Sequence, residues 1–506
     1  MLLPWLIALP FIGGLICCFS ENFGTKKPRW IALITMGLTL TLSLICWMHS
    51  EHELSQIHSG LQWQSQFSIP WIPRFGITFS LAIDGLSLLM VILTSLLGFL
   101  AILCSWKEIN KSHGLFHLNL LWLLGGVIGV FLAIDLFLFF FFWEMMLVPM
   151  YFLIALWGNR SAEGRNRISA ATKFFIYTQV SGLLMLMAIL GLVFVHYIAT
   201  GDLTFYYENL LQTPMSLRVE QVLMIGFFIA FAVKIPVIPL HGWLQDVHSC
   251  SPTAGSVELS GIVLKTATYG LLRFALPLFP HASTIFAPIA MWLGIISIFY
   301  GAWMAFSQND MKRLIACTSI SHMGFLLIAI YTGNLIAYQG AVIHMIAHGL
   351  SAAALFIIAG QLYERLHTCD MRYMGGLWSR IKWLPGLSLF FAMANLGLPG
   401  TGNFIGEFMI FIGGFHIVPW IIIIATCSLV FSAIYSLVMM QKTYYGKSKS
   451  AVLLHNMSPR ELIIILVLLF LLIFLGLYPQ PILDTSYAAM GNIQKLLNAP
   501  MLTIRS

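Results

Sequence analysis

The sequence predicts an all-helical protein that crosses a membrane about fourteen times. Of its 506 residues, 59% are hydrophobic and only 9% are charged, whereas about a quarter of the residues in soluble domains are charged. Apolar runs of about 20 residues, the length that spans a bilayer as a helix, recur along the whole chain. Two of these runs are interrupted beside an ionisable residue, at Lys234 and before Glu407. These observations predict a multi-pass membrane protein with charge in its interior.

The expected spans follow directly from the hydrophobic runs and their polar boundaries. They cover residues 2–19, 30–49, 81–104, 115–134, 136–157, 174–198, 222–244, 254–278, 284–306, 313–331, 335–362, 385–413, 417–441 and 461–480. Asp135 separates two runs that nearly fuse, and we interpret it as a boundary residue near the outer surface.

Lysine and arginine residues test this assignment, because loops on the cytoplasmic side of a membrane are enriched in them. With the N-terminus outside and alternating spans, most of the 26 Lys and Arg residues fall in inner loops. The exceptions are Arg74, Arg218, Lys495 and Arg505 in outer segments, and Lys234, Lys265 and Arg273 within spans. We therefore expect both termini outside. The net charge of +7 then reflects topology and does not indicate a nucleic-acid partner.

The two interrupted spans suggest an internal symmetry. They are the seventh and the twelfth, and an offset of five spans gives the two units opposite orientations, which is typical of inverted repeats with ion sites at the broken helices. We therefore expect N-terminal helices in residues 1–110, a first five-helix repeat in 111–280, a second, inverted repeat in 281–445, and a final span with an outer-surface tail in 446–506.

Three polar segments are expected to fold outside the membrane. The outer loop at about 50–80 is rich in Gln, Ser, Trp and Pro and should form short strands or a hairpin. The inner loop at about 363–383 should carry an interfacial helix, and 481–506 should form a helix on the outer surface.

Lys234 is the first candidate for chemistry. An ammonium at the centre of a bilayer helix costs roughly 2.5–3.5 kcal/mol. Pro236 and Pro239 follow it and should free the carbonyls of Ala232 and Ile235 from their usual donors. Two interpretations are open: a lysine that trades a proton, or a fixed ion pair that joins two helices.

Three further charges lie within apolar segments. Glu144 needs a partner, and a buried lysine is the natural one, the alternative being a protonated, silent carboxyl. Lys265 lies mid-span, and Glu258 lies two turns nearer the inner surface on the same face, so we expect a water chain between them. Arg273 lies two turns beyond Lys265, and we expect its guanidinium to extend to the outer surface.

Histidines and Glu407 complete the set of candidates. Glu407 follows the glycine-rich break and should lie in the outer half of its span. His344 and His348 share a helical face, but no third metal ligand has suitable spacing, so we expect no metal site. Together with His322 they are interpreted as a proton relay or as hydrogen-bonded core histidines. The eight cysteines show no metal-binding spacing.

Three segments carry a resemblance to a known family. They are Val233–Leu244, Ser251–Val257 and Gly261–Phe274, which closely resemble the antiporter-like membrane subunits of respiratory complex I. The similarity covers nearly the whole chain. Leu398–Phe408 resembles one branch of this family, whereas the related L and N subunits usually have lysine where Glu407 stands.

Two positions depart from the family pattern. Gln245 stands where relatives commonly have proline, and Cys250 stands where a polar or acidic residue is usual. Both lie after the seventh span, so they put the local shape of the inner proton entrance in doubt rather than the charged residues themselves.

The resemblance implies a proton-translocating NADH:quinone oxidoreductase of a bacterial inner membrane, with both termini in the periplasm. It implies that Glu144, Lys234, Lys265 and Glu407 form the family's charged proton axis, and that His322 and His348 join the connecting water network. FMN, iron–sulfur clusters and quinone are expected in other subunits, so this chain is expected to bind no cofactor and no NADH. Its expected neighbours are lipid and the L and N subunits.

On this hypothesis, protons enter from the inside near the eighth span, load Lys265 and leave past Glu407, while the Glu144–Lys234 pair acts as a switch. When the pair closes, Lys234 is held charged and its like charge disfavours a proton on Lys265; when the pair opens, that balance reverses. One alternative is a subunit of a multisubunit cation/proton antiporter or membrane-bound hydrogenase, which share the fold. Another is a membrane scaffold with inert ion pairs, although inert pairs rarely accompany broken helices.

Overall fold

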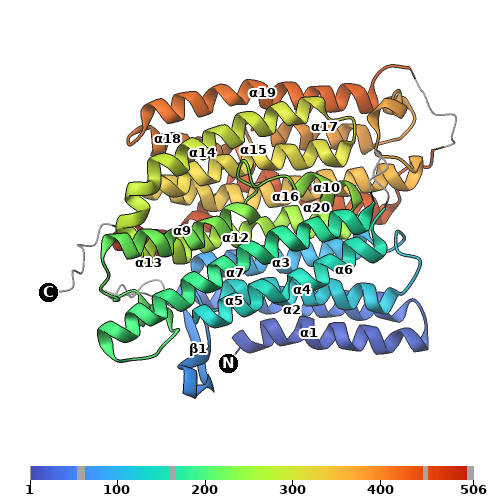
Figure 1. Ribbon diagram of the computed structural model, residues 1–506. Coiled ribbons are helices and arrows are strands. Elements are labelled where there is room, and N and C mark those ends of the chain that lie inside the picture. Colours follow the sequence, from blue (N-terminus) through green and yellow to red (C-terminus); the bar gives the residue numbers. More distant parts are fainter. Residues whose placement is uncertain (1, 54–62, 160–165, 448–453, 498–506) are drawn as a thin grey trace.

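A computed structural model describes residues 2–53, 63–159, 166–447 and 454–497. Its long helices lie side by side and run in roughly one direction, as Figure 1 shows. The start of α1 (Leu3–Ser20) and a β-hairpin lie at the same end of this bundle. We call that end the hairpin side and the opposite end the loop side.

The first half of the chain holds the hairpin and the first interrupted helix. Its elements are α2 (Lys27–Glu53), β1 (Ser65–Ile72), β2 (Ile77–Ile83), α3 (Gly85–Cys104), α4 (His113–Leu132), α5 (Leu136–Met145), α6 (Leu147–Trp157), α7 (Arg167–Thr200), α8 (Tyr207–Leu210), α9 (Leu217–Lys234), α10 (Leu244–Cys250), α11 (Thr253–Glu258), the π-helix η3 (Leu259–Val263), α12 (Leu264–Gly270), the π-helix η4 (Leu271–Ala275) and α13 (Leu276–Leu278).

The second half is helical apart from its loops. Its helices are α14 (Pro280–Ser307), α15 (Met311–Tyr331), α16 (Leu335–Leu366), α17 (Leu384–Asn395), α18 (Gly402–Phe415), α19 (Pro419–Tyr444), α20 (Pro459–Leu477) and α21 (Gln480–Leu497).

The helical membrane fold predicted from the sequence is confirmed, with one β-hairpin besides the helices. Among the described residues, 11 helices are long and apolar enough to cross a membrane. Three more expected spans coincide with interrupted helices: α9–α10, α11–α13 and α17–α18. The total of fourteen crossings and the division into repeats stay predictions.

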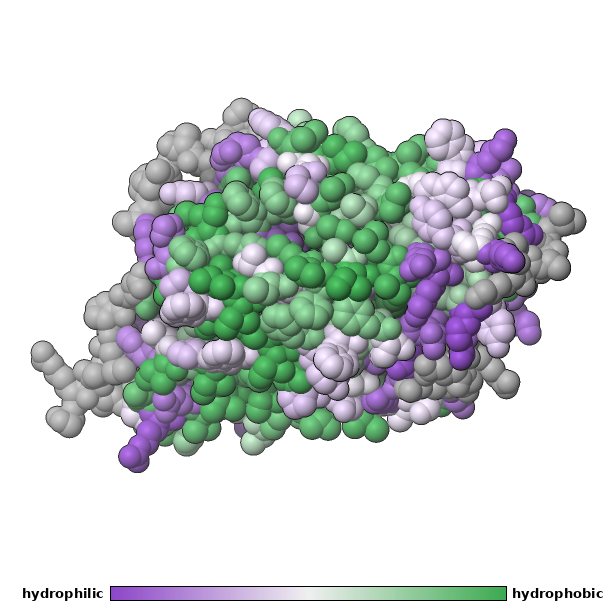
Figure 2. Space-filling model, turned by 90° about the horizontal axis from the view of Figure 1, so that it is seen from above, coloured by the Kyte–Doolittle hydropathy of each residue, from purple (hydrophilic) through white to green (hydrophobic). Residues whose placement is uncertain are grey.

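Burial distinguishes the centre of the bundle from its periphery. The apolar windows of α15 and α16 are 100% buried, whereas those of α2 and α19 are only 28% and 33% buried. Figure 2 shows a broad hydrophobic surface across the middle of one face, with hydrophilic residues gathered towards the two ends. Such a surface is stable against lipid but not against water, so the helices run across the bilayer.

The hairpin expected in the loop at about 50–80 is confirmed. Strands β1 and β2 pair antiparallel, with Ser65 opposite Ile83 and Ser68 opposite Ser80. Residues 54–62 of the same loop lie outside the described part of the chain. The third span starts at Gly85 and not at 81, because β2 continues to Ile83 and Asp84 caps α3 through the backbone N–H of Ser87.

Asp135 is a boundary residue, as predicted. Its carboxylate accepts hydrogen bonds from the backbone N–H groups of Phe137 and Leu138, which begin α5, and from Thr78 of the hairpin. Burial raises the pKa of this carboxyl, and these hydrogen bonds oppose the rise. The hairpin is therefore tied to the bundle where α4 and α5 meet.

The other two loop predictions have different outcomes. The interfacial helix expected at 363–383 is wrong: α16 continues to Leu366, and the loop then forms only the short 3₁₀ turns Met371–Tyr373 and Leu377–Ser379. The helix expected at the C-terminal end is confirmed as α21, up to Leu497. It packs against α3, α13 and α16 on the hairpin side.

Candidate functional site

The first interrupted helix places Lys234 in the interior of the bundle. Lys234 is the last residue of α9 and is 1% exposed. The carbonyl of Ala232 accepts a hydrogen bond from the backbone N–H of Val237 at 2.9 Å, and the carbonyl of Val233 accepts one from the Trp243 indole at 2.9 Å. Pro236 thus withholds the usual donor from the Ala232 carbonyl, as expected, and the N–H of Val237 takes its place because the chain turns back.

The ammonium of Lys234 rests on an aromatic face. Its Nζ lies 3.9 Å from the centroid of the Trp143 ring and 3.5 Å from Sδ of Met146. Among the described residues no carboxylate forms an ion pair with it. The expected contact between Lys234 and Glu144 is thus absent from this structure. A desolvated cation over an indole gains about 2 kcal/mol, so the Trp143 ring offers the ammonium a second binding position besides a carboxylate.

Glu144 points in another direction from the same helix. Neighbouring residues of an α-helix project about 100° apart, so Trp143 faces α9 while Glu144 faces α7, where its Oε1 contacts Gly182. Within the described part of the chain this oxygen has no hydrogen-bond partner. The residue is half-buried. Lys234 and Glu144 therefore form no ion pair here, because Trp143 and Glu144 leave α5 in different directions.

Lys265 lies in a helix of unusual winding. The α-helical turn α12 is flanked by the π-helices η3 and η4, whose wider turns displace the backbone hydrogen-bond ladder. Lys265 is fully buried, and its Nζ donates to the carbonyl of Ser260, five residues earlier. The same Nζ lies 2.7 Å from Nδ1 of His348 on α16. In the widened turn the backbone N–H of Leu264 bonds to the carbonyl of Leu259. In a regular α-helix that N–H would occupy the Ser260 carbonyl, which here accepts from the Lys265 side chain.

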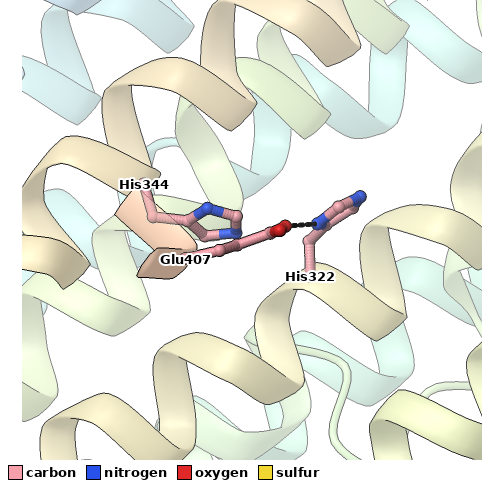
Figure 3. A group of neighbouring side chains, drawn as sticks. All are labelled: His322, His344 and Glu407. Carbon is pink, nitrogen blue, oxygen red and sulfur yellow. Dashed lines mark ion pairs between the residues drawn. The ribbon is translucent and has the colours of Figure 1, made fainter. Parts of the chain in front are cut away.

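Three histidines continue from Lys265 towards the second interrupted helix. The ring centroids of His348 and His322 are 5.0 Å apart, and those of His322 and His344 are 5.4 Å apart. Nδ1 of His322 lies 3.3 Å from Oε1 of Glu407, and Figure 3 shows this contact with His344 beside the same carboxylate. All four side chains are at most 3% exposed.

Helix breakage sets the position of Glu407. Between α17 and α18 the chain turns at Gly397, whose φ of 86° is in the left-handed region that glycine adopts freely. Glu407 then lies in the half of the span nearer the hairpin side. The sequence offered no third ligand for His344 and His348, whereas the structure brings His322 and Glu407, from two other helices, close to His344.

Towards the loop side, a second group of polar side chains leads to Lys265. Glu258 is buried, and within the described residues neither carboxylate oxygen has a hydrogen-bond partner. His248 stacks on Phe356 with ring centroids 4.4 Å apart, and Ser260 lies 3.3 Å from Ser319 between the oxygens. Oxygens and ring nitrogens without protein partners are sites for water.

The two positions that depart from the family pattern, Gln245 and Cys250, lie on α10, which follows the break at Lys234. Gln245 accepts a hydrogen bond from Arg313 at 3.2 Å. The neighbouring Asp246 forms ion pairs with Lys173 at 2.8 Å and with Arg313 at 3.2 Å. Cys250 is fully buried. Gln245 therefore adds a polar contact to a network that closes this part of the loop side.

The side chain of Arg273 does not lie where the sequence predicts. Its guanidinium is buried, forms an ion pair with Asp84, and lies with its Cζ 5.0 Å from the ring centroid of Trp63. The prediction that it extends to the surface is wrong, because the cap of α3 supplies a carboxylate within the protein. The pair joins η4 to the start of α3.

A cavity of about 730 Å³ lies beside Glu407, between α18 and α19. Glu407 forms part of its wall, with Phe408 and Phe411 around it and His416 and Cys427 also lining it. His416 is exposed and follows α18 on the hairpin side. The Glu407 carboxylate therefore contacts the histidines in the interior of the bundle and borders this cavity on the flank.

Comparisons with known proteins place this site in context. Residues 133–432 match the family described as NADH:quinone oxidoreductase/Mrp antiporter, TM. The chain is 71% identical over 498 residues to NADH-quinone oxidoreductase subunit M of Escherichia coli K12, covering 98% of each chain. It is 62% identical over 506 residues to the subunit M of Pseudomonas aeruginosa, covering 100% of this chain and 99% of the relative.

Solved structures have the same fold. A chain of respiratory complex I from Thermus thermophilus with bound NADH superposes with a TM-score of 0.86 at 29% identity, covering 99% of this chain and 100% of that one. A chain of the Mrp complex from Dietzia superposes with a TM-score of 0.82 at 18% identity, covering 98% of this chain and 99% of that one. The second likeness shows the fold alone.

Proposed function

The chain belongs to the subunit M family of NADH-quinone oxidoreductases, within the wider family shared with Mrp antiporters, and we propose that it moves protons through its own interior. It is a multi-pass membrane subunit of a bacterial respiratory complex. The observation that carries the proposal is the run of contacts from Lys265 through His348 and His322 to Glu407.

In the proposed path, protons enter from the loop side and reach Lys265 past Glu258 and His248. Water fills the space around their unpartnered oxygens and nitrogens. Lys265 passes the proton to His348, whose Nδ1 is already within hydrogen-bond distance. The proton leaves through His322 and Glu407 towards the hairpin side, which we assign to the periplasm.

The second part of the proposal concerns Lys234. Its ammonium moves between the Trp143 face, where this structure has it, and the carboxylate of Glu144. On Trp143 the positive charge forms no ion pair and disfavours a proton on Lys265, whereas contact with Glu144 neutralises it more fully. This assigns like-charge repulsion to the separated state, the reverse of the order expected from the sequence.

The residues Glu144, Lys234, Lys265 and Glu407, which we call the charged row, end near opposite flanks of the bundle. We propose that related subunits cover both ends of this row. Glu144 is half-buried on the α5–α7 flank, and Glu407 faces the cavity on the α18–α19 flank. A carboxylate beside lipid is costly, so a protein neighbour at each flank is favoured. We propose the L and N subunits as these neighbours, with FMN, iron–sulfur clusters and quinone held elsewhere in the complex.

Replacement of Lys234 or Glu144 by alanine in the assembled complex tests this function. We expect proton pumping driven by NADH oxidation to fall sharply in proteoliposomes, while reduction of a hydrophilic artificial acceptor by NADH stays normal. Lys495→Ala, at an exposed lysine of α21, is the matched control. Normal pumping in both interior variants would rule out the switch.

A further inference from the structure

His344 has no role in the proposed proton path, yet it lies where that path ends. It is fully buried on α16, and within the described part of the chain neither of its ring nitrogens has a hydrogen-bond partner. Figure 3 shows its ring directed along the Glu407 side chain, on the other side of the carboxylate from His322. A buried imidazole without partners is costly, which points to a ligand.

The group has the chemistry of a transition-metal site. One nitrogen each from His322 and His344 and one oxygen from Glu407 lie within 4.8 Å of one another. Two imidazoles and a carboxylate are typical ligands of zinc, with bonds of about 2.0–2.2 Å. Tetrahedral ligands at that bond length are about 3.4 Å apart, so small side-chain movements would close the site around an ion.

Helix packing holds these three ligands in place. They come from α15, α16 and α18. Helix α18 lies against α16 at Gly406, where a Cβ on residue 406 would come 2.8 Å from the backbone and Cβ of His344. Because glycine at this position permits that close approach, the neighbouring Glu407 is brought level with His344. The arrangement is built into the backbone and does not depend on one flexible side chain.

We propose that His322, His344 and Glu407 form a binding site for a divalent transition-metal ion of the zinc class. An ion bound there uses the His322 nitrogen and the Glu407 carboxylate that would otherwise exchange a proton. Its double positive charge also disfavours a proton on Lys265, which lies one histidine away. Zinc at this site therefore inhibits pumping, a consequence that rests on the proposed function, whereas the binding itself does not.

The cavity beside Glu407 gives the ion an approach. Its lining includes His416, Cys427 and Thr426, and His416 is exposed on the hairpin side. The approach therefore starts at the hairpin end of the cavity, beside the flank that we propose a neighbouring subunit covers, and does not cross the Lys265 region. Since protons compete with the metal for imidazole nitrogens, zinc binding weakens as the pH falls.

Binding is tested first, on the whole purified complex. After removal of metals with a chelator, the complex is incubated with Zn²⁺ alone, desalted, and its zinc content is measured by mass spectrometry. We expect His344→Leu to retain about one zinc ion fewer per complex than the unsubstituted protein. The control is His117→Leu, another buried histidine on α4, which should retain the full content. Equal zinc content in all three complexes overturns the site.

Inhibition is tested separately in proteoliposomes. The concentration of Zn²⁺ that halves proton pumping should rise at least tenfold in His344→Leu and stay unchanged in His117→Leu, and pumping without zinc should persist in both. If zinc binds through His344 but does not slow pumping, the metal site is supported and the proposed inhibition is overturned. If His344→Leu loses pumping even without zinc, His344 belongs to the proton path, and the proposed mechanism of zinc inhibition is overturned.

A second variant keeps the site testable if leucine prevents assembly. His344→Cys preserves a ligand but makes it a soft thiolate, which favours Cd²⁺ over the harder cations. We expect this variant to regain metal binding and to be inhibited by a lower Cd²⁺ concentration than the unsubstituted complex. Unchanged cadmium sensitivity would show that residue 344 does not contact the ion, against the proposal.

Discussion

Lys265 Nζ lies 2.7 Å from Nδ1 of His348, in the fully buried centre of the bundle. Its other hydrogen bond goes to the carbonyl of Ser260. Both partners are neutral acceptors when the imidazole is neutral, so they hold an ammonium without a counter-charge. A charge held in this way is easily lost, because burial disfavours it. Lys265 is therefore suited to release a proton rather than to form a permanent ion pair.

Replacing His348 by leucine removes the acceptor that Lys265 faces. We expect the initial rate of proton pumping to fall at least about tenfold, a smaller loss than the roughly 100-fold or more that a proton-transferring side chain typically contributes. The measurement is the initial rate of acidification in proteoliposomes. His117→Leu, a buried histidine on α4 away from the row, serves as the control, and an unchanged rate in His348→Leu would exclude it from the path.

Trp143 should matter through its aromatic face. We expect Trp143→Leu to weaken the separated position of Lys234 by about 2 kcal/mol, the gain of a desolvated cation over an indole, and to shift the ammonium towards Glu144. Pumping should slow markedly in Trp143→Leu and less in Trp143→Phe, which keeps a weaker ring. Equal rates in the two variants would indicate that Trp143 only fills space.

Glu407 should need its charge as well as its shape. Glu407→Gln keeps the side-chain volume but cannot exchange a proton with His322, so we expect pumping to fall about tenfold or more. Glu407→Asp keeps the carboxylate, and we expect it to retain part of the activity. Comparable pumping by Glu407→Gln and the unsubstituted complex would remove Glu407 from the exit.

The Arg273–Asp84 pair should contribute to stability. Removing one partner of a buried ion pair typically costs about 3–5 kcal/mol, because the other charge is left alone. We expect Asp84→Asn to lower the temperature at which the complex loses this chain, as followed on native gels. The double variant Asp84→Asn, Arg273→Gln should be less destabilised than Asp84→Asn alone, and the opposite order would contradict the pair's assigned role.

Much of the fold follows from local patterns in the sequence. Apolar runs predict the helices, and prolines or glycines beside Lys234 and Glu407 predict the two breaks, because both effects act within a few residues. The wrong interfacial helix at 363–383 shows the limit of this reasoning. A mixed polar segment is compatible with a helix or with turns, and packing against the bundle decides between them.

The site was only partly predictable, because its contacts join distant parts of the chain. Helical periodicity places His344 and His348 on one face, but it does not say that Glu407 and His322 of two other helices meet His344. Pairing opposite charges favours Glu144 for Lys234, whereas the structure has the ammonium on the Trp143 ring. Arg273 finds Asp84 across 189 positions of sequence, which no local pattern reveals.

The central claim is that protons pass through Lys265 of this chain. It is tested most directly by the number of protons pumped per NADH oxidised in proteoliposomes containing the complex with Lys265→Met, which keeps the length and apolar stem of the side chain. We predict a lower ratio than in the unsubstituted complex, while Lys495→Met at an exposed site leaves it unchanged. An unaltered ratio in the assembled Lys265→Met complex would contradict the account.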